Sequence, residues 1–173
     1  MEFQKIKDRK TLYLIRQDLF NGEYVLTDHQ NNFGKLTYDG LARETAEIGS
    51  YYGDWKLGYD FEPFGNAQII IYDNTDLFLG EIIVGYNYLH QPPSLAMADG
   101  FTGIFSKTDL LSNTYQWKSN ISGSLIHIKN ALFSMTNTIT VIDDDITEEK
   151  ITLLSFLAQH LLILKGRRKQ SSY

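Results

Sequence analysis

A cluster of acidic residues near the carboxyl end of the chain is the first candidate for chemistry. Asp143, Asp144, Asp145 and Glu148 stand close together, and Glu149 follows directly. Hard cations such as Ca²⁺ prefer several oxygen ligands from one tight loop, so the cluster is a candidate calcium site. It lacks the alternating acids, glycine and distal glutamate of an EF-hand loop. The competing interpretation is a solvated turn that caps the start of a helix.

A second candidate is the basic group formed by Lys165, Arg167, Arg168 and Lys169. Each cation held near an anionic membrane surface contributes about 1 kcal/mol to binding, so this group predicts reversible association with anionic lipid. The competing interpretation is an ordinary charged helix end followed by a frayed terminus.

A third candidate is a pair of carboxylates for hydrolysis, either Asp60 with Glu62 or Asp73 with Asp76. Hydrolases of this type use one carboxyl group as an acid and the other as a base or nucleophile. Such pairs also occur by chance in an acidic chain. The sequence therefore leaves a carboxylate-dependent hydrolase open as an alternative.

Other catalytic and metal-binding motifs are missing from the sequence. There is no cysteine, which excludes thiolate metal sites and thiol nucleophiles, and the four histidines show no H-x-x-x-H or H-E-x-x-H spacing. The sequence also lacks G-x-S-x-G, a phosphate-binding loop and a dinucleotide-binding fingerprint. We therefore expect no cofactor and predict that the protein is not an enzyme.

The length and the net charge of the chain indicate its domain organisation and argue against one class of partner. The 173 residues predict one domain, residues 1–173, which is long enough to bury a core without disulfides. The net charge of -5 argues against binding nucleic acid over a whole surface. The opening stretch MEFQKIKDRK contains no apolar run of the kind found in signal peptides, so a cytoplasmic location is predicted.

Most of the chain has the pattern of short antiparallel strands. Turn residues recur every eight to twelve positions, between runs rich in Tyr, Ile, Val, Phe and Thr. Residues 41–50 fit either a helical turn or another strand. The predicted strands are 11–16, 23–27, 33–39, 55–61, 68–72, 77–86, 95–98, 101–106, 113–118, 122–129, 131–136 and 138–142.

The periodicity changes to that of a helix after the acidic cluster. Asp145 or Thr147 is suited to cap its start, and the acids Glu148 and Glu149 fall in its first turn, where they oppose the helix dipole. Lys165 followed by Gly166 predicts its last turn and its end.

This helix is apolar on nearly all sides. Nine large apolar side chains fall among the fourteen residues 151–164. If half of the helix faced water, four or five of them would stay exposed, at a loss of ~1.5–3 kcal/mol each. Fourteen residues span about 21 Å, short of the roughly 30 Å hydrocarbon core of a bilayer, so a membrane tail is the weaker alternative. A closed sheet around the helix fits better, and eight strands are too few to hold it.

The passage TITVIDDDITEEKITLLSFLAQHLLILKG, residues 138–166, runs from the last predicted strand through the acidic turn into the helix. With the many short strands before it, it resembles the Tubby C-terminal-like superfamily and, within it, the LURP-one-related branch. The resemblance implies a twelve-stranded barrel threaded by its last helix. It also implies phosphoinositide binding, although no residue here matches the headgroup-binding positions on Tubby barrels. Scramblase relatives are thought to bind calcium just before the equivalent helix.

The sequence thus predicts a mainly β protein, a closed antiparallel barrel of about twelve strands around a central hydrophobic C-terminal helix. The predicted function is a non-enzymatic binding module that associates reversibly with anionic, phosphoinositide-type membrane lipid headgroups through its basic residues. A structural or protein-interaction domain remains the alternative from another class.

Overall fold

The computed structural model describes residues 2–7, 10–18, 22–38, 45–61, 67–85, 91–131 and 135–170, without the side chains of Phe61 and residues 168–170. Within these ranges twelve strands precede one helix, α1 (Glu148–Gln170). The strands are β1 (Thr11–Arg16), β2 (Tyr24–Thr27), β3 (Asn32–Tyr38), β4 (Ala46–Ser50), β5 (Asp54–Phe61), β6 (Ala67–Asp73), β7 (Phe78–Val84), β8 (Ser94–Met97), β9 (Thr102–Lys107), β10 (Thr114–Ser119), β11 (Gly123–Lys129) and β12 (Thr136–Val141).

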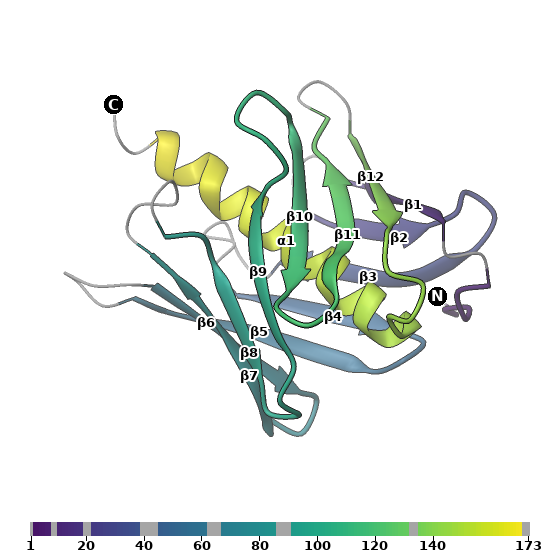
Figure 1. The fold of residues 1–173 in the computed structure, drawn as a ribbon. Coiled ribbons are helices and arrows are strands. Elements are labelled where there is room, and N and C mark those ends of the chain that lie inside the picture. The colour runs from purple at the N-terminus through teal and green to yellow at the C-terminus, as the bar shows by residue number, and fades with distance from the viewer. Residues whose placement is uncertain are drawn as a thin grey trace.

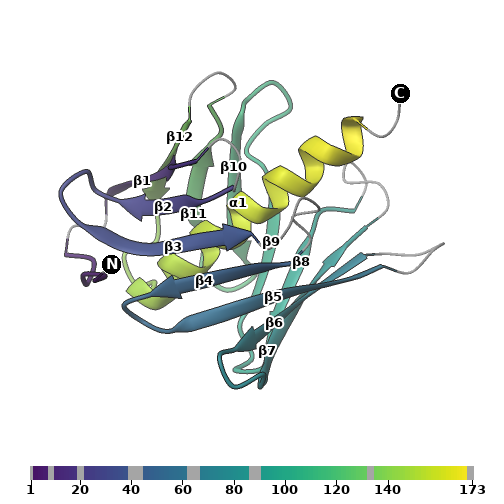
Figure 2. The same ribbon diagram turned by 180° about the vertical axis from the view of Figure 1, so that it is seen from behind.

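The strands close into a barrel. Each strand pairs antiparallel with its neighbours in the sequence, and β1 pairs with β12, where Leu12 lies opposite Ile139 (Figures 1 and 2). Closure removes the sheet edges that would otherwise present unpaired backbone groups. The predicted fold class, a closed antiparallel barrel of about twelve strands with a C-terminal helix, is confirmed.

The structure decides one open assignment and changes one strand prediction. Residues 46–50 form β4, which decides that part of the segment 41–50 in favour of a strand, while residues 41–44 lie outside the described residues. The separate strand predicted at 131–136 is wrong, because Ala131 and Met135 lie outside any strand and Thr136 already belongs to β12. The Asn137 side chain instead accepts the backbone N–H of Ala131 at 3.0 Å and so ties down the connection from β11.

The helix α1 runs through the barrel. Every residue from 151 to 161 is buried, including the polar residues Thr152, Ser155, Gln159 and His160. Both ribbon views show strands on either side of this part of the helix (Figures 1 and 2). The expectation that the sheet encloses the helix is therefore confirmed for these residues, and the membrane-tail alternative is wrong.

Direct contacts fix the helix to the wall. The indole Nε1 of Trp117, in β10, donates to the backbone carbonyl of Leu154 at 3.0 Å. On the β3 side, Gly34 lets the ring of Phe156 approach the strand, since a Cβ at position 34 would lie 3.0 Å from that ring and 2.9 Å from the carbonyl oxygen of Gly49. Packing on opposite sides thus holds the middle of α1.

The start of α1 agrees with the sequence prediction, and its end does not. Thr147 caps the start, as its hydroxyl accepts the N–H of Lys150 at 3.3 Å and its carbonyl accepts the N–H of Ile151 at 2.9 Å. The predicted end at Gly166 is wrong, because α1 continues through this residue to Gln170. A single glycine inside a helix costs about 1 kcal/mol relative to alanine, which the packed turns before it offset.

Candidate functional site

The basic residues predicted to bind lipid lie where α1 leaves the barrel, which we call the exit end. Lys165 is half-buried there, and its Nζ lies 3.3 Å from the hydroxyl of Tyr115 and 4.8 Å from the centre of its ring. The Nζ of Lys107, at the end of β9, lies 5.9 Å from the centre of the same ring. Tyr115 therefore brings together two cations that are 58 positions apart in the sequence.

Arg167 extends this basic group by another half turn of α1. Its side chain is half-buried. Burial first, and the positive charge of Arg167 second, lower the pKa of His160, seven residues earlier in α1. Arg168 and Lys169 also fall within α1, but their side chains lie outside the described residues. We call Lys107, Tyr115, Lys165 and Arg167 the helix-exit surface.

The acidic residues predicted to bind calcium lie at the opposite, entry end, between β12 and α1. Lys165 lies seventeen positions after Glu148 in α1, or about 26 Å further along the helix. The Oδ1 of Asp143 accepts the N–H of Asp145 at 3.0 Å, as in a turn that precedes a capped helix. In the described part of the chain, no three acidic or histidine side chains form a group that could hold a metal ion. The positions of Asp143, Asp144, Asp145 and Glu148 thus favour the capping turn.

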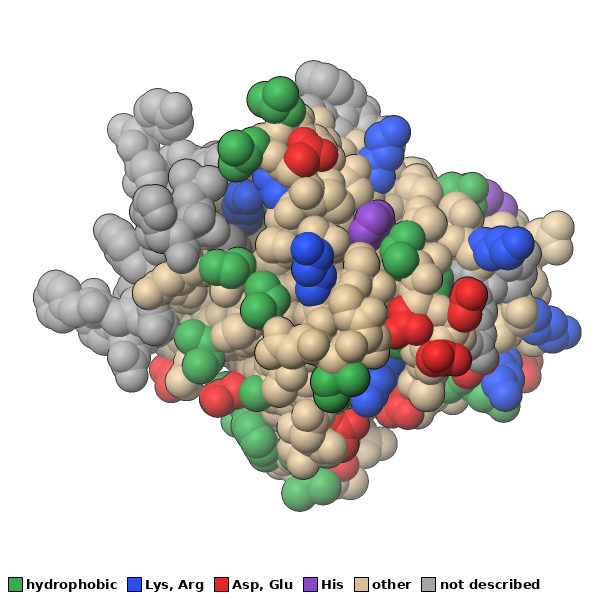
Figure 3. All heavy atoms as spheres, viewed as in Figure 1, with side chains coloured by type: hydrophobic (Ala, Val, Ile, Leu, Met, Phe, Trp, Pro, Cys, Tyr) green, Lys and Arg blue, Asp and Glu red, His purple; other side chains and the backbone are tan. Residues whose placement is uncertain are grey.

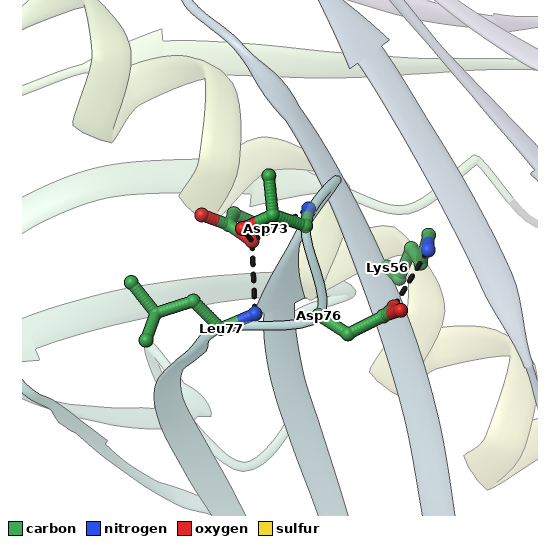
Figure 4. A network of polar contacts seen from close by, with 5 residues as sticks. Lys56, Asp73, Asp76 and Leu77 are labelled. Carbon is green, nitrogen blue, oxygen red and sulfur yellow. Dashed lines mark hydrogen bonds and ion pairs between the residues drawn. The ribbon is translucent and has the colours of Figure 1, made fainter.

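One of the two carboxylate pairs can be located, and it belongs to the β6–β7 turn (Figure 4). The Oδ1 of Asp73 accepts the N–H groups of Thr75 and Leu77, at 2.8 and 2.9 Å, and the hydroxyl of Thr75 at 2.7 Å. These hydrogen bonds, the Thr75 hydroxyl first, lower the pKa of Asp73, whereas a general acid needs a raised pKa. Asp76 pairs with Lys56 at 2.6 Å.

These contacts assign Asp73 and Asp76 to the structure of the turn. In the other pair, Asp60 belongs to β5, and Glu62 lies outside the described residues.

A contact between Ser124 and His127 on the outer wall was not predicted from the sequence. Their spacing of three would place them on opposite faces of a regular strand. However, Trp117 pairs with Ile126 and Lys118 with Ser124, so Leu125 is an extra residue in β11. This β-bulge brings the Ser124 Oγ to 2.9 Å from the His127 Nε2, and the hydroxyl also lies 3.2 Å from the Oε1 of Gln116. No signal in the sequence marks the bulge.

The environment of His127 favours the neutral form of its imidazole. Desolvation by partial burial lowers its pKa, and the positive charge of Lys118 lowers it further. A neutral imidazole nitrogen can either donate a hydrogen bond to a hydroxyl or accept one from it, depending on the tautomer. Together with Gln116, the pair joins β10 to β11 on the outside of the barrel.

Comparisons with protein-family models, curated proteins and solved structures find no match to this chain. Among the described residues, α1 included, no helix has both the length and the hydropathy needed to cross a bilayer.

Proposed function

We propose that this protein is a non-enzymatic binding module that associates reversibly with anionic membrane lipid headgroups through its helix-exit surface. The observation that carries the proposal is the gathering of Lys107, Lys165 and Arg167 around the point where α1 leaves the barrel. Tyr115 orients two of these cations, so their arrangement does not depend on a free chain end.

Electrostatics favour one orientation at a membrane. Each cation near an anionic surface contributes about 1 kcal/mol, so three to five cations give measurable and reversible binding. The protein as a whole carries a net charge of -5 and is repelled by such a surface. The acidic turn at the entry end adds to this repulsion. The protein is therefore expected to approach with its exit end towards the lipid.

The resemblance to Tubby-like domains supports the same class of ligand, since it implies phosphoinositide-type headgroups. The resemblance supports the class of ligand but not the position of its site, because a fold by itself does not determine a function. The proposed surface rests instead on the residues of this chain, and it lies at the mouth of the barrel, where α1 emerges.

Vesicle co-sedimentation tests the proposal. The protein is mixed with vesicles of phosphatidylcholine, with or without phosphatidylserine or a phosphoinositide, and the bound fraction is measured at several salt concentrations. We expect binding only with anionic lipid, and a decrease as salt screens the charges. Equal recovery in the supernatant with both kinds of vesicle contradicts the proposal and leaves a structural or protein-interaction role.

A matched pair of double variants locates the surface. Lys165→Gln with Arg167→Gln removes two positive charges at the exit end and should weaken binding at least tenfold. Lys5→Gln with Lys7→Gln removes two exposed charges from the N-terminal segment, which pairs through Gln4 with Asn32 near the entry end. The second variant should bind like the unaltered protein. Equal loss in both variants indicates attraction by overall charge without a defined surface.

A further inference from the structure

Two adjacent leucines stand out in the loop between β9 and β10, residues 108–113. Leu110 is 88% exposed and Leu111 is 97% exposed. Isolated apolar residues are common on protein surfaces, but two large neighbouring side chains at one loop tip form a contiguous apolar projection. Figure 3 shows hydrophobic side chains at the tip of this loop, at the top of the view.

Hydrogen bonds within the loop hold the leucines outward. The Oδ1 of Asp109 accepts the N–H groups of Leu111 and Ser112 at 3.0 and 2.7 Å. The Nζ of Lys107 donates to the carbonyl of Leu110 at 3.3 Å. At the base of the loop, the N–H of Thr108 donates to the carbonyl of Thr114 at 3.0 Å. Bonds within the loop thus satisfy the N–H groups of Thr108, Leu111 and Ser112 and the carbonyl of Leu110.

The loop projects from the exit end, beside the proposed lipid-binding residues. Lys107 is the last residue of β9 and Tyr115 is the second residue of β10, so the loop begins and ends at the helix-exit surface. In both ribbon views the β9–β10 loop and the end of α1 lie at the same end of the barrel (Figures 1 and 2). An apolar tip beside a group of cations matches the chemistry of an anionic bilayer, with its hydrocarbon beneath charged headgroups.

We propose that Leu110 and Leu111 insert into the bilayer and anchor the protein once the helix-exit surface has met anionic headgroups. This inference rests on the proposed function and adds a hydrophobic contact to it. The hydrogen bonds to the N–H of Leu111 and to the carbonyl of Leu110 lower the cost of insertion, because backbone groups that enter a membrane need partners within the protein. Asp109 limits the depth, so the two side chains enter the interface while the carboxylate stays among the headgroups.

Labelling with an environment-sensitive dye tests the insertion directly. The chain contains no cysteine, so Leu111→Cys provides a single thiol for a nitrobenzoxadiazole label. Ile121→Cys is the matched control, since Ile121 is 94% exposed in the turn at the other end of β10. With vesicles of phosphatidylcholine and phosphatidylserine, the label at position 111 should shift to shorter wavelength and gain intensity, and the label at position 121 should not.

Co-sedimentation of unlabelled variants measures the contribution of the leucines. Leu110→Ser with Leu111→Ser should lower the vesicle affinity about tenfold or more, whereas Ile121→Ser should leave it unchanged. The loss should persist at high salt, because hydrophobic insertion is not screened as charge attraction is. Circular dichroism of each variant checks that the barrel is intact, which the exposure of all three residues leads us to expect.

The outcomes separate this inference from the proposed function. If the unaltered protein sediments with anionic vesicles while the label at position 111 does not respond, insertion is overturned and headgroup binding stands. If the unaltered protein does not sediment, both are overturned. If the label responds to protein concentration without vesicles, the leucines contact a second copy of the chain, and insertion is again overturned.

Discussion

The hydroxyl of Tyr38 lies 3.0 Å from the Nδ1 of His160 inside the barrel. The two rings also stack, with centres 5.6 Å apart and an angle of 18° between their planes. In the described part of the chain, the Nε2 of His160 is the buried side-chain polar atom that has no hydrogen-bond partner. A histidine on the enclosed helix is therefore joined to β3 through one nitrogen and desolvated at the other.

This arrangement predicts a loss of stability in acid. Burial first, and the charge of Arg167 second, lower the pKa of His160 from 6.5 to about 3. Between these values the unfolded chain binds a proton that the folded barrel does not, so the free energy of unfolding rises with pH in this window. The contribution of neutral His160 to the free energy of unfolding is fully present above about pH 6.5. It is lost as the pH falls towards 3, by up to ~1.4 kcal/mol per pH unit.

Urea unfolding at a series of pH values, with the unaltered protein and His160→Gln, measures this loss. The stability of the variant should fall less between pH 6.5 and 4.5, because its side chain does not titrate. His127→Gln is the control on the outer wall, where the ring is only half-buried, and it should keep most of the acid dependence. Parallel curves for the unaltered protein and His160→Gln would show that His160 is not the buried titrating group.

A buried charge in the middle of α1 should abolish folding. Leu157 is fully buried inside the barrel, so Leu157→Asp places an unpaired carboxylate there at a cost of several kcal/mol. We expect loss of the cooperative unfolding transition, measured by circular dichroism. Leu111→Asp is the matched control at an exposed position and should change stability by less than about 0.5 kcal/mol. A Leu157→Asp variant of native stability would mean that the helix is not enclosed.

The sequence was sufficient to predict the barrel because its turn residues and its apolar helix indicated the same fold. Turn residues separated the strands, and a helix apolar on nearly all sides required a surrounding sheet. The four polar residues of the enclosed part of α1 did not conflict with this, since local bonds satisfy two of them. The hydroxyls of Thr152 and Ser155 donate to the carbonyls of Glu148 and Ile151, four residues earlier in each case.

Features that depend on tertiary packing were not predictable. The Ser124–His127 contact requires the extra residue Leu125 in β11. Two neighbouring apolar residues, here Leu125 and Ile126, do not by themselves reveal a bulge. The contact of Lys107 and Lys165 with one tyrosine depends on the closure of the barrel around α1. The exposure of Leu110 and Leu111 was missed for a related reason, because sequence alone does not distinguish a projecting loop from a packed one.

The helical state of Gly166 leads to a stabilising substitution. The sequence predicted that the helix ends here, in which case a left-handed glycine would tolerate alanine poorly. In the structure, α1 continues through this residue, and nothing lies within 4 Å of an added Cβ. Gly166→Ala should therefore raise the free energy of unfolding by about 0.5–1 kcal/mol.

Thermal or urea unfolding measures the effect of Gly166→Ala against Gly34→Ala. At Gly34 an added Cβ meets the backbone of β4 and the ring of Phe156, so alanine should destabilise the barrel. Destabilisation by Gly166→Ala as well would indicate that the helix ends where the sequence suggested.

The buried pair Asn137 and Gln159 links β12 to α1 and predicts a measurable coupling energy. The Nδ2 of Asn137 donates to the Oε1 of Gln159 at 2.7 Å, and both side chains are buried. Gln159→Leu keeps the volume similar but leaves the Asn137 amide without this acceptor, so stability should fall by about 1–3 kcal/mol. In a double-mutant cycle with Asn137→Ala, the second substitution should cost less once the first is made, because the unpaired donor is then removed. Strictly additive losses, measured by urea unfolding at neutral pH, would show that the bond does not couple helix and wall.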